Sequence, residues 1–243
     1  MRPELTRKFN AELLLSIHVP KTGGTALRKV LLARFGSNLH LDYGYDTNIE
    51  NTEADIRAIH THNPYVAYKD IQEETKVLTI LREPLDRAIS HYYYWLNLPS
   101  TEDPEPHGEI YRKYFLDQKP DLEKFLLSDD HWMQNIYTQH FLYPLSKPED
   151  FWFIGFLETF DEDIADLQRL LGLKRTKPPV ENKGQKPPIK ISDALKRDFY
   201  ELNRKDKVFY DAMFAERNKR KKKIIGVEAI RNIIRKTYHI LRT

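Results

Sequence analysis

The sequence predicts an α/β protein in which helices cover a central parallel β-sheet. Three apolar runs of strand length lead to this prediction, at residues 13–19, 76–84 and 151–156. Each run is followed by a segment with helical periodicity. Parallel strands need crossover connections, which are usually helices, so strands that alternate with helices indicate a parallel sheet. With 243 residues, the chain is long enough for one such domain.

The first strand is followed by a helix over residues 26–35, where apolar side chains recur at helical spacing and Gly36 is expected to end the helix. A polar and aromatic stretch with Tyr43 and Tyr45 comes next. We predict a short helix over residues 52–59 in this stretch, followed by a turn at the Asn-Pro pair of residues 63–64.

The second strand is expected to end at Pro84, and Asp86 to begin the helix DRAISHYYYWLN. Consecutive helical residues fan out around the axis, so we expect most of the aromatic side chains in YYYW to pack in the core. Gly172 is expected to cap a helix over residues 161–171. Further helices are predicted near residues 122–127, 131–142, 193–203 and 207–216, with a surface loop at residues 174–190.

Composition and charge indicate one domain over residues 1–216 and a basic tail over residues 217–243. The tail has a basic amphipathic pattern, which suits an anionic membrane surface or packing against the domain or a partner. The sequence has no cysteine, which excludes thiolate chemistry and agrees with a reducing compartment such as the cytoplasm. No run is apolar enough to span a bilayer, and a net charge of +3 is too small to indicate nucleic-acid binding.

The turn PKTGGT, between the first strand and its helix, has the residue types of an anion site. Gly23 and Gly24 let backbone N–H groups approach an anion closely, and the helix that follows adds the positive end of its dipole. Lys21 supplies a charge, while the hydroxyls of Thr22 and Thr25 can donate hydrogen bonds. The loop differs from the nucleotide-hydrolase pattern GxxxxGK[ST], because its lysine precedes the glycines.

A second anion site is predicted where the second strand ends. Arg82 stands at that strand end and Ser90 follows on the next helix. Ligands of open α/β sheets bind outside the carboxyl ends of the strands, so Arg82 and the Lys21 loop are expected to face one pocket. A guanidinium suits phosphate, and two such sites indicate a ligand with two separated phosphate-like groups.

The two motifs HVPKTGGTAL and LTILREPLDRAISHYYYW resemble the nucleotide-binding signatures of sulfotransferases that use 3′-phosphoadenosine 5′-phosphosulfate (PAPS). The form is most similar to the carbohydrate branch, which includes heparan sulfate 2-O-sulfotransferase and bacterial relatives, and the likeness covers roughly residues 13–216. The resemblance implies a three-layer fold with a parallel sheet, like that of P-loop nucleoside triphosphate hydrolases. It also implies sulfuryl transfer from PAPS to a hydroxyl of a carbohydrate or glycolipid, with adenosine 3′,5′-bisphosphate (PAP) released.

The resemblance further implies roles for three groups of residues. The 5′-phosphosulfate would be held by Lys21, Thr22, Gly23, Gly24 and Thr25. The 3′-phosphate would be held by Arg82 and Ser90. A loop with Asn182, Lys183 and Gly184 would close over the nucleotide. Lys21 is the candidate to neutralise charge that grows on the bridging and leaving oxygens, and this arrangement does not require a metal.

A base must accept the proton of the acceptor hydroxyl, and histidine suits this task because its ordinary pKa lies near neutrality. His60 and His62 alternate in IHTHNPY, so they would point the same way in an extended segment. The carbohydrate branch carries a similar His-x-His with catalytic roles. We expect His62 to be the base, His60 to orient or bind substrate, and His18 to be structural.

Asn135, Thr138 and Gln139 lie where bacterial relatives often show Asn-x-x-Thr-Arg, with Gln139 in place of the arginine. If that arginine binds an acidic sugar in the relatives, its replacement by Gln139 predicts a less anionic acceptor for this protein.

Two other functions stay open at the level of sequence. One is a kinase-like phosphotransferase, but the chain lacks GxxxxGK[ST] and a convincing strand-end aspartate for magnesium. This function would also leave the pairing of Arg82 with Ser90 unexplained. A non-catalytic, membrane-associated nucleotide-binding protein would keep the anion sites without the base.

Overall fold

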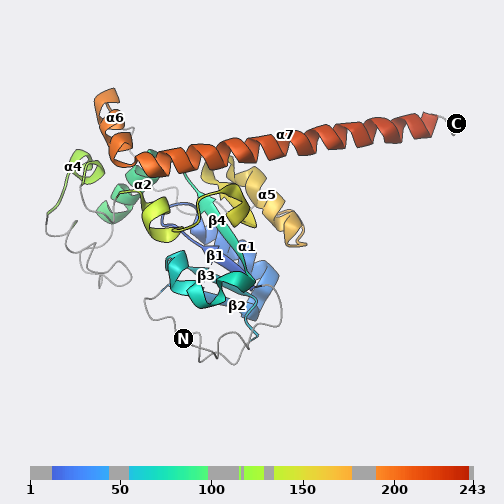
Figure 1. Cartoon of the computed structure of the whole chain (residues 1–243), viewed down its shortest axis with the longest axis horizontal. Coiled ribbons are helices and arrows are strands. Elements are labelled where there is room, and N and C mark those ends of the chain that lie inside the picture. The colour runs from blue at the N-terminus through green and yellow to red at the C-terminus, as the bar shows by residue number, and fades with distance from the viewer. Residues whose placement is uncertain are drawn as a thin grey trace.

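The computed structural model describes residues 13–43, 55–97, 115, 118–128, 134–176 and 190–240 (Figure 1). For residues 70, 72–74 and 223–240 it describes the backbone alone. Tyr45 and the predicted loop residues Asn182, Lys183 and Gly184 lie outside the described residues.

Five parallel strands form the central sheet, in the order β2-β3-β1-β4-β5. Their bounds are Leu13–Ile17 for β1, Leu39–Asp42 for β2, Ala58–Thr61 for β3, Thr75–Leu81 for β4 and Phe153–Phe156 for β5. The predicted α/β class and parallel sheet are therefore confirmed, and β1, β4 and β5 coincide with the three predicted strands.

The predicted helix over residues 52–59 is wrong where the structure describes it. Residues 55–57 are extended, and residues 58 and 59 begin β3, a strand whose four residues are all buried. β3 pairs with β2 on one side and with β1 on the other, so its conformation comes from its neighbours in the sheet. A four-residue strand with histidine and threonine in it lacks the long apolar run by which a buried strand is found.

The helices cover the sheet on both faces (Figure 1). On one face, α1 (Gly24–Phe35) and α5 (Phe160–Leu170) share an apolar cluster with β1 and β4. On the other, α7 (Arg204–Ile240) and the π-helical turn η6 (Ile136–Phe141) pack against the alternate side chains of β1. A third cluster joins α2 (Pro84–Leu96), α4 (Leu122–Leu126) and α6 (Asp193–Leu202) beside the carboxyl end of β4.

Local sequence explains where several helices begin and end. The Glu83 carboxylate caps α2 by accepting hydrogen bonds from the N–H groups of Leu85 and Asp86, so the helix starts two residues before the predicted Asp86. Gly172 has a φ of 70° and follows α5, as predicted. Four short 3₁₀ segments complete the described elements: η2 (Gly36–Asn38), η4 (Tyr65–Glu74), η7 (Pro148–Asp150) and η8 (Leu157–Thr159).

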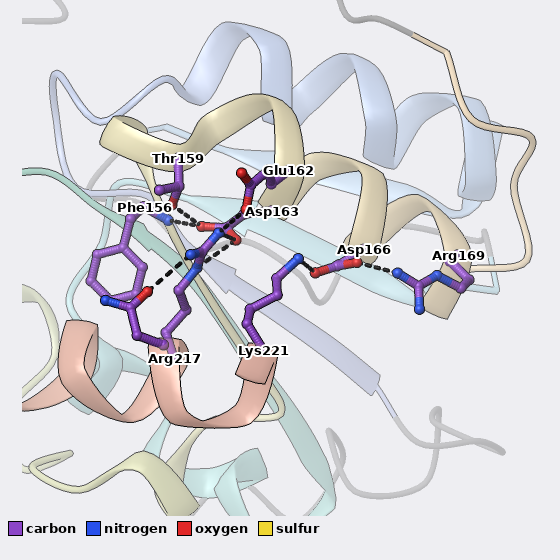
Figure 2. Close-up of polar contacts among 9 residues, drawn as sticks. Phe156, Thr159, Glu162, Asp163, Asp166, Arg169, Arg217 and Lys221 are labelled. Atoms are coloured by element: carbon purple, nitrogen blue, oxygen red, sulfur yellow. Dashed lines mark hydrogen bonds and ion pairs between the residues drawn. The ribbon is translucent and has the colours of Figure 1, made fainter. Parts of the chain in front are cut away.

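α7 is one continuous helix, where the sequence predicts a helix over residues 207–216 and a separate tail. Just past the predicted boundary, Arg217 donates a 2.7 Å hydrogen bond to the buried carboxylate of Asp163 on α5, and Lys221 pairs with Asp166 (Figure 2). Residues 217–221 of the predicted tail are therefore bound to the domain, while the C-terminal part of α7 extends away from it (Figure 1). Among the described helices, none is both long and apolar enough to cross a membrane.

Candidate active site

The loop between β1 and α1 has the conformation of an anion cradle. Lys21 and Gly23 have positive φ angles of 73° and 94°, and α1 begins immediately after them, at Gly24. The first turn of α1 contains no acidic residue, so nothing there offsets the positive end of its dipole. Thr25 lies partly exposed in that first turn. The loop thus presents backbone N–H groups and a lysine at the carboxyl end of the central strand.

The hydroxyl of Thr22 corrects one part of the prediction. Thr22 is fully buried, and its hydroxyl donates a 2.8 Å hydrogen bond to the carbonyl oxygen of Val19. The hydroxyl therefore stabilises the turn from inside, which leaves the backbone N–H of Thr22 as the group that can serve an anion.

Both glycines lie in close packing, and Gly23 also has a positive φ of 94°. A Cβ on Gly23 would lie 3.0 Å from Cδ1 of Leu157 and 3.1 Å from the Phe160 ring. A Cβ on Gly24 would lie 1.8 Å from Cε1 of His18, far inside van der Waals contact. The His18 ring thus packs against the loop at Gly24, and only glycine at this position leaves room for the ring.

Replacing Gly24 by alanine is expected to lower the free energy of unfolding by about 1–3 kcal/mol, the usual cost of overpacking. The cost should nearly vanish in a His18→Ala background, because the opposing ring is then absent. Chemical denaturation of the two single variants and the double variant would measure both values. An equal cost of Gly24→Ala with and without the His18 ring would contradict this account of the loop.

Arg82 meets the Lys21 loop, as predicted. Arg82 directly follows β4, and its Nη1 lies 3.4 Å from the carbonyl oxygen of Lys21. Tyr137, fully buried on η6, accepts a hydrogen bond from the N–H of Arg82 and donates one of 2.6 Å to its carbonyl oxygen. Ser90 is buried on α2, the helix that starts beside Arg82. The ends of β1 and β4 therefore form one site with two cationic side chains.

The three histidines form a cluster on the other side of the loop. The His18 ring lies 5.3 Å from the His60 ring, in a stacked arrangement, and 4.4 Å from the His62 ring. The ring of Tyr43 lies 4.9 Å from that of His62. His60 and His62 thus approach the same neighbour, in agreement with the predicted extended segment. His18 links them to the Lys21 loop through Gly24.

The two histidines of the predicted pair differ in burial, because His60 is fully buried whereas His62 is partly exposed. His60 is fully buried in β3, and its Nδ1 lies 2.9 Å from the hydroxyl oxygen of Ser16. Burial above all, and then the nearby His62 and Arg28, lower the pKa of His60 to about 3. Burial and the same cluster also lower the pKa of His18 well below its ordinary value. His60 and His18 are therefore neutral near pH 7, and His60 is a weak base.

Arg87 and Asp206 are buried charges that the sequence reasoning missed. Arg87 is 2% exposed on α2, with Nη1 at 3.3 Å from Nδ1 of His91. Asp206 accepts hydrogen bonds from the N–H groups of Tyr137 and Thr138. In the sequence, Arg87 and Asp206 resemble ordinary surface charges, and their burial comes from the tertiary packing of α2 and α7.

Of the group Asn135, Thr138 and Gln139, the first two hold α7 in place. The Oδ1 atom of Asn135 accepts a hydrogen bond from the N–H of Lys205, and the Thr138 hydroxyl donates one to Asp206. The side chain of Gln139 is exposed. Asn135 and Thr138 therefore have structural roles at the start of α7. Among the described residues, no three His, Asp or Glu side chains are grouped so that they could hold a metal ion.

Comparison with known proteins identifies the family. The model of the sulfotransferase family, Sulfotransfer_2, matches residues 9–215. The chain belongs to this family. The family match includes the Lys21 loop, the His18 cluster and Arg82 with α2, so the described site lies wholly within the region that family members share.

Solved sulfotransferase structures show weak overall similarity to the family member described here. The mouse sulfotransferase SULT7A1, in a crystal structure complexed with PAP, is 19% identical with a TM-score of 0.37. That match covers 79% of this chain, which spans 64% of the mouse protein. A sulfotransferase from Alicyclobacillus acidocaldarius is 14% identical with a TM-score of 0.42, and the match covers 81% of this chain and 92% of that one. No curated protein matches the sequence.

Proposed function

We propose that the protein is a PAPS-dependent O-sulfotransferase that transfers a sulfuryl group to a hydroxyl of a carbohydrate or glycolipid and releases PAP. The observation that carries the proposal is the approach of the Arg82 guanidinium to the Lys21 carbonyl, at 3.4 Å. It joins two anion-binding elements at one sheet edge, and PAPS has phosphate groups at two separate positions of its ribose. Membership of the sulfotransferase family supports the same reaction.

At the 5′ end, the phosphosulfate fits the loop because Lys21 and Gly23 have the positive φ angles of an anion cradle and α1 begins at Gly24. Thr22 and Gly24 would contribute backbone N–H groups, and Thr25 would add a hydroxyl. The ammonium of Lys21 would neutralise charge on the bridging oxygen as its bond to sulfur breaks.

At the 3′ end, Arg82 would bind the phosphate through its guanidinium, whose fork of N–H donors matches phosphate oxygens. The Tyr137 hydroxyl forms hydrogen bonds with both the N–H and the carbonyl oxygen of Arg82, which fixes the backbone from which the long side chain extends. Ser90 would donate its hydroxyl to the same phosphate. The contribution of Asn182, Lys183 and Gly184 stays a prediction.

At the acceptor, His62 is the base that the arrangement favours. The acceptor oxygen forms a bond to sulfur, the bond from sulfur to the bridging phosphate oxygen breaks, and the electron pair goes to that oxygen. The hydroxyl proton goes to the imidazole of His62. His60 suits this step less well because of its low pKa and its contact with Ser16, and we assign it to orienting the site.

Isothermal titration calorimetry with PAP, 5′-AMP and ATP tests the nucleotide assignment. Without magnesium, PAP is expected to bind most tightly, because it alone offers a 3′-phosphate to Arg82. Arg82→Met should weaken PAP about 10- to 100-fold, the usual range for hydrogen bonds to a charged group, and leave 5′-AMP nearly unchanged. Arg57→Met is the matched control, because Arg57 precedes β3 at the amino ends of the parallel strands, whereas Arg82 follows β4 at the carboxyl ends.

Transfer of labelled sulfate from PAPS to glycans and glycolipids tests the reaction itself. Incorporation into one acceptor class would identify the substrate. Tighter binding of ATP than of PAP would favour the kinase-like alternative. PAP binding with no transfer to any glycan or glycolipid would favour the non-catalytic, membrane-associated binding protein.

A further inference from the structure

Tyr94 differs from the other aromatic residues of α2. Tyr92 and Trp95 are buried and pack with Phe115 and Phe125 in one apolar cluster, which agrees with the predicted core role. Tyr94 remains 37% exposed. Its ring faces the phosphate loop, where the Nζ atom of Lys21 lies 3.9 Å from the ring centroid.

Lys21 is held at its backbone as well as at its ammonium. Its φ of 73° is in the left-handed region, which a residue with a Cβ adopts only where the surroundings hold it. Arg82 contacts its carbonyl oxygen, while Tyr94 receives the far end of its side chain. Ser90 lies one helical turn before Tyr94, so the two side chains share a face of α2. Arg82 and Tyr94 thus contact Lys21 at its two ends, the carbonyl oxygen and the ammonium.

An aromatic ring is well suited to position a catalytic ammonium. The ring face attracts the cation through its quadrupole, but it has no formal negative charge. A carboxylate in the same place would neutralise Lys21 and compete with the phosphosulfate. A lysine side chain without any holder would have to be ordered in each turnover, at the cost of its rotamer entropy.

We propose that Tyr94 is a positioning residue that holds the Lys21 ammonium at the phosphate loop, ready for the bridging oxygen. The proposal rests on the PAPS-dependent reaction described above and adds to it a residue that acts through Lys21. The ring carries this role, so the phenol hydroxyl contributes little.

Steady-state kinetics of Tyr94 variants test the proposal. Tyr94→Leu is expected to lower kcat about 5- to 30-fold, the range that corresponds to a partly desolvated cation–π contact. The KM for PAPS and the Kd for PAP should change less than about twofold, because Arg82 and the loop backbone remain. Tyr94→Phe keeps the ring and should stay within about twofold of the wild type. Leu96→Ala is the control, since Leu96 is 52% exposed on another face of the same helix.

A double variant tests whether Tyr94 acts through Lys21. Lys21→Met/Tyr94→Leu should be no slower than Lys21→Met alone, because no ammonium is left to position. The inference is overturned if Tyr94→Leu turns over like the wild type, if Tyr94→Phe is as slow as Tyr94→Leu, or if the loss persists in the Lys21→Met background. A wild-type protein that neither binds PAP nor transfers sulfate overturns the proposed function together with this inference, whereas the first three outcomes leave the proposed function intact.

Discussion

His62→Ala is expected to lower kcat for sulfuryl transfer by about 10²- to 10⁴-fold, the usual contribution of a general base. The affinity for PAP should stay within about twofold, because the proposed nucleotide contacts lie at the Lys21 loop and at Arg82. Single-turnover transfer from PAPS would measure the chemical step, and calorimetry with PAP would measure binding. Loss of transfer with retained binding is the signature of a base.

The comparison with His60→Ala makes this test sharper. His60 is fully buried and its Nδ1 atom contacts Ser16, so the alanine variant should lose stability and, through it, the arrangement of the cluster. At a temperature where both variants are folded, we expect the larger loss of kcat for His62→Ala. Unchanged turnover of His62→Ala would contradict the assignment of His62 as the base. A large loss of kcat in His60→Ala alone would indicate that His60 is the base.

Lys21→Met is expected to lower kcat by about 10²- to 10³-fold, the range seen when one preorganised group that stabilises transition-state charge is removed. Methionine keeps an unbranched side chain of similar length. Both residues have a Cβ, so the strain of the positive φ at position 21 is the same in the variant and the wild type. The substitution therefore isolates the charge.

Single-turnover kinetics of Lys21→Met would be compared with those of Lys196→Met, an exposed lysine on α6 that pairs with Asp193 at the surface. The control should turn over like the wild type. If Lys21→Met lost only PAP affinity and kept its kcat, Lys21 would be an anchor for the nucleotide and its proposed part in the chemical step would be wrong.

The prediction of the sheet succeeded where a strand is a continuous apolar run. β1 and β4 are buried on both faces, and their sequences LLLSI and TKVLTIL show it directly. β2 and β3 escaped prediction because LHLD and AIHT are short and mix apolar with polar side chains. Their pairing with the central strand supplies the hydrogen bonds that make them strands, and that pairing depends on segments far apart in the chain.

The structure brings the two predicted halves of the site together, whereas the contacts that support them were not predicted in detail. The order of strand, glycine turn and helix indicates an anion site from local sequence alone, and Arg82 indicates a second one. Three supports came only with the fold: the inward hydroxyl of Thr22, the His18 ring against Gly24, and Tyr137 at the backbone of Arg82. The signal for His18 was its place two residues before PKTGGT, which points to packing only once the loop is closed.

By itself, the sequence determined the α/β class, the order of strand, glycine turn and helix around Lys21, and the family, because these depend on residue types at short spacing along the chain. The tertiary structure alone decided that Tyr94 faces Lys21 while its neighbours fill a core, and that His60 is buried against Ser16 while His62 follows the strand end. The physical reason is that burial and the approach of charges depend on which elements pack together. A side chain's chemistry in the site follows from those neighbours, and they come from distant parts of the sequence.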